Sequence, residues 1–345
     1  MKWTVLVPAE SRVLVDEAQP TPDLRAIFYR VHGSSLAQRV LRKIGRLDLD
    51  QVMSKRLELS QRLDSLREVN AIWLSPAYLS PSEMGWLLDR LPELKWVYSQ
   101  MTGTDHLDLD YFRERGIKVS NNGQLSSRRV AEMALADIFA QAKRLPTHMK
   151  LQRRRRWKPL QSDDVSRQTV GIIGTGNIGT ELARLCRAVG LRVIGASRDP
   201  KRPGLASKAF DHVVGLEDEL DELLRESDYV VLALPLKPET RGLIGAKQLS
   251  RLKRDATLIN VARGSLVDER ALCRALRRGA LAAAYIDCPT TMPPAPWSQL
   301  YRTPNLVLTH YSSVNSPRAL QDAFEQFTFG LEQLAQTGAP PDRVD

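Results

Sequence analysis

The stretch TVGIIGTGNIGTELARLCRAVGLRVIGASRD, residues 169–199, decides the fold. The apolar residues of 170–173 predict a buried parallel strand, because strands covered on both faces read as nearly continuous hydrophobic runs. Apolar residues then recur at helical spacing up to Gly190, whose position is typical of a helix end. A second apolar run at 192–196 predicts another strand. The segment therefore predicts a complete strand–helix–strand unit of a doubly wound α/β domain.

The turn between this strand and helix carries the pattern G-x-G-x-x-G. Gly174 allows a tight turn, Gly176 lets a pyrophosphate approach the backbone, and Gly179 lets helix and strand pack closely. Free N–H groups at the helix start would then bind the phosphates. The turn residues predicted to bind a dinucleotide are Gly174, Thr175, Gly176, Asn177, Ile178 and Gly179.

The end of the second strand indicates which dinucleotide binds. An NAD site usually places Asp or Glu there to bind the ribose 2′-hydroxyl. This chain has Ser197 and Arg198 instead, with Lys201 and Arg202 close behind. A hydroxyl and a guanidinium would bind a 2′-phosphate, which a carboxylate would repel. The charges favour NADP(H) over NAD(H), although a shift of one residue would turn Asp199 toward the ribose.

Length and composition are typical of a globular protein with two domains. The chain has 345 residues, of which 43% are hydrophobic and 26% charged, and no apolar run approaches the length of a membrane span. The N-terminus reads as a strand rather than a signal peptide. Three widely spaced cysteines indicate reduced thiols in a cytoplasmic protein. The histidines lack metal-binding spacing, so no metal site is expected. Without a long apolar run, no membrane partner is expected either.

The net charge of +10 raises the question of a nucleic-acid partner. The sharpest basic run, residues 153–156, is followed by Trp157 and Lys158, but the remaining excess is spread along the chain. A nucleic-acid interface needs basic residues gathered on one element together with a reader motif. We therefore expect no nucleic-acid partner, and attribute part of the charge to a pocket for an anionic cofactor.

The order of patterns predicts one domain inserted into another. Apolar runs predict strands at 5–7, 71–74, 96–99 and 118–120, and later at 229–233, 256–261, 282–286 and 306–308. Helical patterns are found at 128–145 and 318–336, and the polar, Leu- and Arg-rich residues 23–67 are predicted to form one or two exposed helices. The expected organisation is a substrate domain of residues 1–120 plus 311–345 and a dinucleotide-binding Rossmann domain of residues 121–310.

Several further motifs carry a family resemblance. They are LKWVYS (94–99), TGTDH (102–106), RRRWK (154–158), ALPLKPETRGLI (233–244) and INVARGSLVD (259–268). With them the chain resembles the D-isomer-specific 2-hydroxyacid dehydrogenases, and most of all their glyoxylate/hydroxypyruvate reductase branch. The resemblance implies two Rossmann-like domains with an active site in a cleft between them, and a homodimer. It also implies hydride transfer between a nicotinamide cofactor and a 2-keto acid.

Enzymes of this family use an Arg, a Glu and a His, and the resemblance extends only to the first. Arg263 would bind the substrate, since a permanent cation polarises a carbonyl and stabilises alkoxide-like charge. Met292 stands where the Glu is expected. Tyr311 stands where the His is expected, although a slip of one residue would restore His310 to that place. The two losses are consistent with each other, because the Glu serves to raise the pKa of the His.

The resemblance assigns other roles by position. By resemblance, the substrate carboxylate is bound by Thr102, Gly103 and Thr104. The nicotinamide is contacted by Val261, Ala262 and Asp287. The cofactor cleft is lined by Leu234, Pro235 and Thr240.

Three functions remain open from the sequence. The first is an NADP(H)-dependent oxidoreductase that reduces a 2-keto acid-like carbonyl or an imine in a specialised biosynthetic pathway. In it Tyr311, whose ordinary pKa is near 10, is a proton donor or substrate anchor, or only fills the pocket. The second is a conventional 2-ketoacid reductase that uses His310. The third is a catalytically silent dinucleotide-binding sensor or corepressor.

Overall fold

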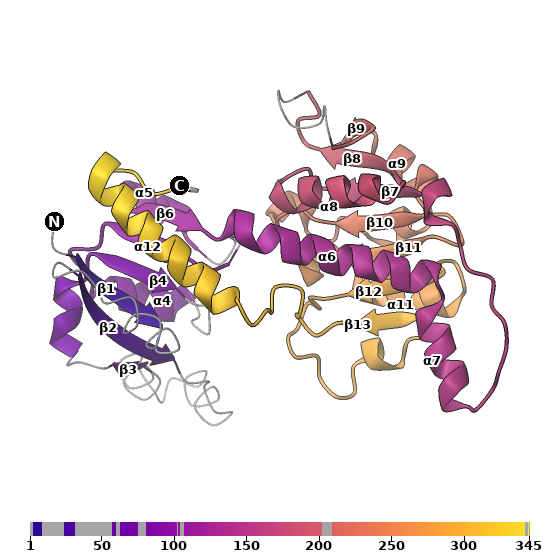
Figure 1. The fold of residues 1–345 in the computed structure, drawn as a ribbon, viewed down its shortest axis with the longest axis horizontal. Helices are drawn as coiled ribbons and strands as arrows, with labels where there is room; N and C mark the ends of the chain where they lie inside the picture. The colour runs from indigo at the N-terminus through magenta and orange to yellow at the C-terminus, as the bar shows by residue number, and fades with distance from the viewer. Residues whose placement is uncertain are drawn as a thin grey trace. The chain divides into compact units, whose positions relative to one another are not determined.

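The computed structural model divides into two compact units. It describes residues 3–8, 24–31, 57–59, 63–74, 81–101, 103, 107–201, 209–341 and 344. The terminal unit comprises Met1–Gly123 and Ser316–Asp345, and the central unit comprises Gln124–Asn315. Each unit has its own largely parallel sheet (Figure 1), so the predicted fold of two Rossmann-like α/β domains is confirmed. The sequence had placed the divisions at 120/121 and 310/311.

The terminal unit contains a six-stranded sheet with strand order β3-β2-β1-β4-β5-β6. The strands are parallel except β3, which runs antiparallel to β2. They are β1 (Trp3–Pro8), β2 (Leu24–Val31), β3 (Leu57–Leu59), β4 (Ala71–Leu74), β5 (Trp96–Ser99) and β6 (Lys118–Asn121). The helical elements are η2 (Leu63–Glu68), α4 (Pro81–Leu88), α5 (Leu109–Glu114) and α12 (Ala319–Thr337).

Aromatic packing joins α12, the last helix of the chain, to this N-terminal sheet. The Phe327 ring stacks on the Trp96 ring, with centroids 5.1 Å apart and planes 9° from parallel. One turn later, Gly330 leaves room for the same indole, since a Cβ there would lie 2.5 Å from Trp96 Cη2. The two ends of the chain therefore share one core.

The helices predicted for residues 23–67 are wrong at 24–31 and 57–59, which are strands, whereas residues 63–67 are helical within η2. Residues 24–31 form β2, which pairs in parallel with β1 from Leu24 to Tyr29, and residues 57–59 form β3. The arginines at positions 25 and 30 made the segment look polar, but its middle, Ala-Ile-Phe-Tyr, is rich in residues that favour strands. Pairing with a neighbouring strand decided the structure of this segment.

The central unit contains a seven-stranded parallel sheet with strand order β13-β12-β11-β10-β7-β8-β9. Its strands are β7 (Thr169–Ile173), β8 (Arg192–Ser197), β9 (His212–Gly215), β10 (Tyr229–Leu232), β11 (Thr257–Asn260), β12 (Ala283–Ile286) and β13 (Leu306–Leu308). The order reverses between β7 and β10, which is the topological switch point where such sheets bind ligands at the carboxyl ends of their strands.

Helices cover both faces of this sheet (Figure 1). The helices on one face include α6 (Gly123–Ala142) and α8 (Asn177–Ala188). Those on the other include α9 (Leu220–Glu226), α10 (Ala246–Leu249) and α11 (Glu269–Arg277). The remaining helical elements are α7 (Leu145–Arg153), η3 (Val165–Arg167), η4 (Pro238–Thr240), η5 (Gly264–Leu266) and η6 (Gln299–Arg302).

The long helix predicted at 128–145 has different bounds in the structure. It begins earlier and ends earlier, as α6, and a separate helix, α7, follows. Most of its predicted apolar face is buried, but the face also includes a buried carboxyl, Asp137. No helix among the described residues is both long enough and apolar enough to cross a membrane.

Candidate functional site

The glycine turn after β7 packs against the start of the loop that follows β10. Gly174 has a φ of +108°, and a Cβ there would lie 2.5 Å from the carbonyl oxygen of Ala233. A Cβ at Gly179 would overlap the carbonyl oxygen of Gly174, whereas one at Gly176 would meet nothing within 4 Å. This geometry matches the turn and packing roles predicted for Gly174 and Gly179. It also leaves open space at Gly176, which caps the N-terminus of α8.

These contacts predict opposite results for two alanine substitutions in one motif. Gly179→Ala is expected to lower the free energy of unfolding by about 2–3 kcal/mol, because the methyl group collides with backbone. Gly176→Ala adds its methyl to open space and should cost less than about 1 kcal/mol, mainly through a poorer helix cap. Urea unfolding of both variants measures the difference. Equal losses of stability would contradict the packing role of Gly179.

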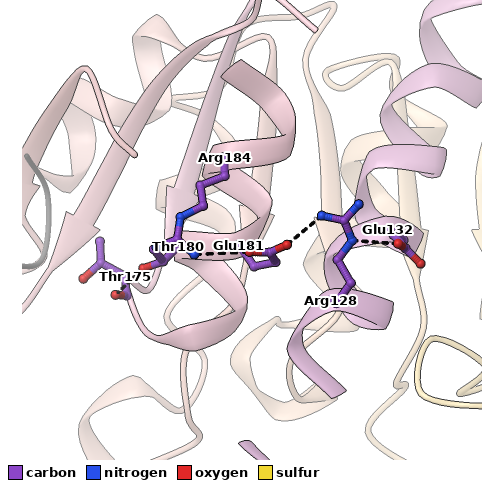
Figure 2. A network of polar contacts seen from close by, with 6 residues as sticks. All are labelled: Arg128, Glu132, Thr175, Thr180, Glu181 and Arg184. Atoms are coloured by element: carbon purple, nitrogen blue, oxygen red, sulfur yellow. Dashed lines mark hydrogen bonds and ion pairs between the residues drawn. The ribbon is translucent and has the colours of Figure 1, made fainter. Parts of the chain in front are cut away.

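A polar network joins α6 to the first turns of α8 (Figure 2). The Arg128 guanidinium donates to Glu181 Oε1 at 2.7 Å and to Glu132 Oε1 at 2.8 Å. Arg184 lies 3.3 Å from the other oxygen of Glu181, and Thr180 donates to the carbonyl of Thr175 at 3.2 Å. The hydrogen bond from Arg128 holds the pKa of the Glu181 carboxyl below its usual range. The network thus neutralises the Glu181 carboxylate close to the N-terminus of α8, the end of a helix that attracts anions.

A pocket opens at the carboxyl ends of β7, β8 and β10. It gathers many of the residues predicted to bind the cofactor: Gly174, Thr175, Gly176, Ser197, Arg198, Leu234, Pro235 and Thr240. Its other lining residues are Ala196, Asp199, Leu216, Ala233 and Lys237. The predicted residues Asn177, Ile178 and Gly179 lie in α8, while Val261, Ala262 and Asp287 lie at the ends of β11 and β12.

The rim of this pocket carries both cations and carboxylates. Arg198 Nη1 lies 3.5 Å from Glu239 Oε1, and both side chains are about half exposed. The Ser197 hydroxyl is bonded to the backbone N–H and carbonyl of Asp199. Lys237 was missed as a pocket residue by sequence reasoning, although it stands inside the motif at 233–244. It lines the pocket with Arg198 because β8 and β10 lie on either side of β7 and all three strands end at the pocket.

Arg263 is held at the end of β11 by a buried asparagine. The side chain of Asn260 accepts from Ala262 N–H and donates to the carbonyl of Arg263, each at 3.0 Å. Gly264 allows the next loop to approach, because a Cβ there would overlap the backbone of Thr290. Arg263 is half-buried, with Nη1 donating to the carbonyl of Ala262 at 2.9 Å. A cation is therefore fixed at the edge of the sheet where the strands end.

Asp287 anchors the loop that carries both candidate proton donors. Its carboxylate accepts from Thr309 Oγ1 at 2.7 Å, Ser312 N–H at 2.9 Å and Ser313 N–H at 3.3 Å. Its backbone carbonyl accepts from Tyr311 N–H at 2.7 Å. These bonds hold His310 and Tyr311 with φ of 58° and 56°, a conformation that costs non-glycine residues free energy. Within this loop His310 is exposed and Tyr311 is half-buried.

The other sequence-predicted positions are less informative. Met292, which stands at the expected acid position, is 55% exposed. Gly103 lies in the terminal unit, while Thr102 and Thr104 are outside the described residues. Burial raises the pKa of the Cys288 thiol, next to Asp287, to about 12. Among the described residues, no cluster of three or more His, Cys, Asp or Glu side chains is arranged to hold a metal ion.

Comparison with known proteins decides the family. Residues 135–313 match the family "D-isomer specific 2-hydroxyacid dehydrogenase, NAD binding domain". The chain belongs to the D-isomer-specific 2-hydroxyacid dehydrogenases. It is 36% identical over 234 residues to a glyoxylate reductase of Thermococcus gammatolerans, covering 65% of this chain and 68% of the relative. It is 32% identical over 268 residues to a glycerate dehydrogenase of Methylorubrum extorquens, covering 75% and 81%.

A solved structure supports the same membership. An NADPH-dependent glyoxylate/hydroxypyruvate reductase of Sinorhizobium meliloti, in complex with NADP and malonate, superposes with a TM-score of 0.75 at 26% identity. The match covers 100% of this chain and 97% of that one. The predicted family and enzyme class are therefore confirmed. This D-2-hydroxyacid dehydrogenase family member is an NAD(P)-dependent oxidoreductase acting on a CH–OH/C=O pair.

Proposed function

We propose that the protein is an NADP(H)-dependent reductase of a 2-keto acid-like carbonyl or an imine. The observation that carries the cofactor preference is the pocket rim, where Ser197 and Arg198 take the place of an acidic residue and Lys237 adds a second cation. A 2′-phosphate would bind between these cations. To reach the phosphate, Arg198 would give up its contact with Glu239. The relative from Sinorhizobium meliloti, which was solved with NADP, supports the same preference.

The preference is tested by removing each cation. Arg198→Ala and Lys237→Ala are each expected to raise the Kd for NADPH about tenfold, because each removes a charge-assisted hydrogen bond to phosphate. The Kd for NADH should change less than about twofold, since NADH lacks that phosphate. Fluorescence titration of both nucleotides measures this, with Lys247→Ala, exposed on α10 and outside the pocket, as the matched control. Equal weakening of both nucleotides would contradict the assignment.

Arg263 supports a reductase rather than a silent binding protein. A guanidinium held at the strand ends suits a substrate carbonyl and carboxylate, and a protein that only binds a dinucleotide has no need for it. Loss of the usual acid at Met292 and of His at Tyr311 supports a substrate other than glyoxylate, in a specialised biosynthetic pathway. Tyr311 is proposed as proton donor or substrate anchor, because Asp287 holds its backbone.

The proton donor is tested with a pair of neighbouring substitutions. Tyr311→Phe is expected to lower kcat for NADPH-dependent reduction by about 100-fold, the usual contribution of a general acid. His310→Gln should change kcat less than about threefold, since His310 is exposed on the loop. Turnover is measured with glyoxylate, hydroxypyruvate and a panel of bulkier keto acids and imines. The reverse pattern would favour the conventional reductase with His310, and tight NADPH binding without any turnover would favour the sensor.

We also propose a cytoplasmic homodimer. The region after α6 exposes apolar side chains that a second copy would cover, among them Leu145, Met149 and Trp157, the last 96% exposed. Apolar exposure of this kind on one segment is typical of an interaction surface. All three cysteines are buried free thiols, which suits a reducing compartment. Sedimentation velocity across a concentration series tests the dimer.

A further inference from the structure

Asp137 is a carboxyl on the buried face of α6. It is 6% exposed and belongs to the same helix face as Val130, Ala134 and Ile138. Asp137 follows Val130 by seven residues, or about two helical turns, which places the two on one face of α6. A carboxyl on such a face has no obvious structural benefit, since burial of an ionised group is costly.

The packing of α6 on β12 brings Asp137 to Asp287. Tyr285 in β12 donates its hydroxyl to Gln141 Oε1 at 3.4 Å. Asp137 lies one helical turn before Gln141, about 6 Å along the helix, and Asp287 lies two residues after Tyr285 on the same side of the chain, about 6.6 Å along the strand. The two carboxyls therefore lie near each other, and the charge of Asp287 acts on Asp137.

The surroundings of Asp137 favour its protonated form. The titratable groups that interact with Asp137 are Tyr285 in β12 and Asp287 directly after β12, whereas Gln141 on its own helix is neutral. No salt bridge reaches it within the part of the chain that the structure describes. Burial, and after it the negative charge of Asp287, raises the pKa of the Asp137 carboxyl to about 7. Two like charges in one buried space oppose each other's ionisation.

We propose that Asp137 is a positioning residue whose carboxyl is protonated beside Asp287 below neutral pH, so that no second negative charge opposes the Asp287 carboxylate as it holds the Tyr311 loop, residues 309–313, in place. The three donors that the Asp287 carboxylate accepts come from this loop. Ionisation of Asp137 adds a second negative charge to the buried pair. The repulsion between the two charges is relieved when the loop loosens and water enters. Asp137 thereby sets the alkaline limit of catalysis by Tyr311, a consequence that rests on the proposed function.

The loop itself reports on this proton. In NMR spectra of the full chain, the amide resonances of Ser312 and Ser313 are expected to titrate with a midpoint near neutral pH, and their hydrogen-exchange protection to fall about tenfold above it. In Asp137→Asn neither change should occur, and Asp137→Leu, which suits the apolar surroundings, provides a second variant for the same test. Asp255→Asn, at an exposed aspartate of the central unit, should behave as wild type. Persistence of the titration in a folded Asp137 variant would overturn the inference, as would its absence from the wild type.

Turnover separates this inference from the proposed function. In wild type, kcat for NADPH-dependent reduction should fall above neutral pH, and in Asp137→Asn this fall should move to higher pH or vanish. Active enzyme with identical pH profiles and identical amide titrations in both proteins would sink the proton inference and leave the reductase standing. Loss of the amide titration in the variant of a protein without turnover would support the proton site and reject the reductase.

Discussion

Arg263→Gln is expected to lower kcat/KM for keto-acid reduction about 1,000-fold, the largest effect on activity among the substitutions considered. Gln keeps hydrogen-bonding capacity but removes the positive charge that would stabilise the developing alkoxide. The two hydrogen bonds by which Asn260 holds the loop reach the N–H of Ala262 and the carbonyl of Arg263, so they do not depend on the Arg263 side chain. Steady-state kinetics with NADPH and the best substrate of the panel measures the change.

Two further variants interpret that loss. Arg263→Lys keeps the charge without the planar fork, and should recover about tenfold of the lost activity. Arg278→Gln, at an exposed arginine after α11, is the matched control and should retain wild-type rates. The Kd for NADPH should stay within about threefold in all three variants, since the residue is proposed to contact substrate and not phosphate. A parallel loss of NADPH binding would move Arg263 from the substrate to the cofactor.

The central sheet was predictable because its signals are local. The apolar runs that became β7, β10, β11 and β12 are buried on both faces, so they read as continuous hydrophobic segments. The glycine turn requires a positive φ at Gly174 and a close approach of backbone at Gly179. Glycine is the residue type that permits both, so the sequence alone indicates them. Parallel strands end at a common edge, so residues at their carboxyl ends, such as Ser197 and Arg263, lie along that edge.

Features that depend on a distant partner were not predictable in the same way. β2 forms where polar residues flank a short apolar stretch, because β1 offers it a ladder of backbone hydrogen bonds. Lys237 lines the same pocket as the end of β8 because the sheet places β10 and β8 on either side of β7. The left-handed backbone of His310 and Tyr311 has no sequence signal, since Asp287, more than twenty residues away, imposes it through its hydrogen bonds.

Asp137 is expected to make the protein less stable as the pH rises toward neutral. Its pKa is about 7 in the folded protein against an ordinary value of 3.8, so the folded state binds more protons than the unfolded state between these values. The stabilising contribution is therefore complete below pH 3.8 and is lost as the pH rises through about 7. Each pH unit within this window lowers the free energy of unfolding by about 1.4 kcal/mol, giving up to about 4 kcal/mol in total.

The Asp137→Asn variant isolates this contribution from all other titrating groups. Urea unfolding of wild type and variant at matched pH values gives a difference in the free energy of unfolding, from which the shared pH dependence cancels. This difference should shift in favour of the variant by up to about 4 kcal/mol between acidic and neutral pH, and stay constant above it. Asp255→Asn, at an exposed aspartate, is the matched control for the general effect of removing one carboxylate. A flat difference curve for Asp137→Asn would mean that Asp137 is ionised in the folded protein at neutral pH, and that the charge beside Asp287 is tolerated.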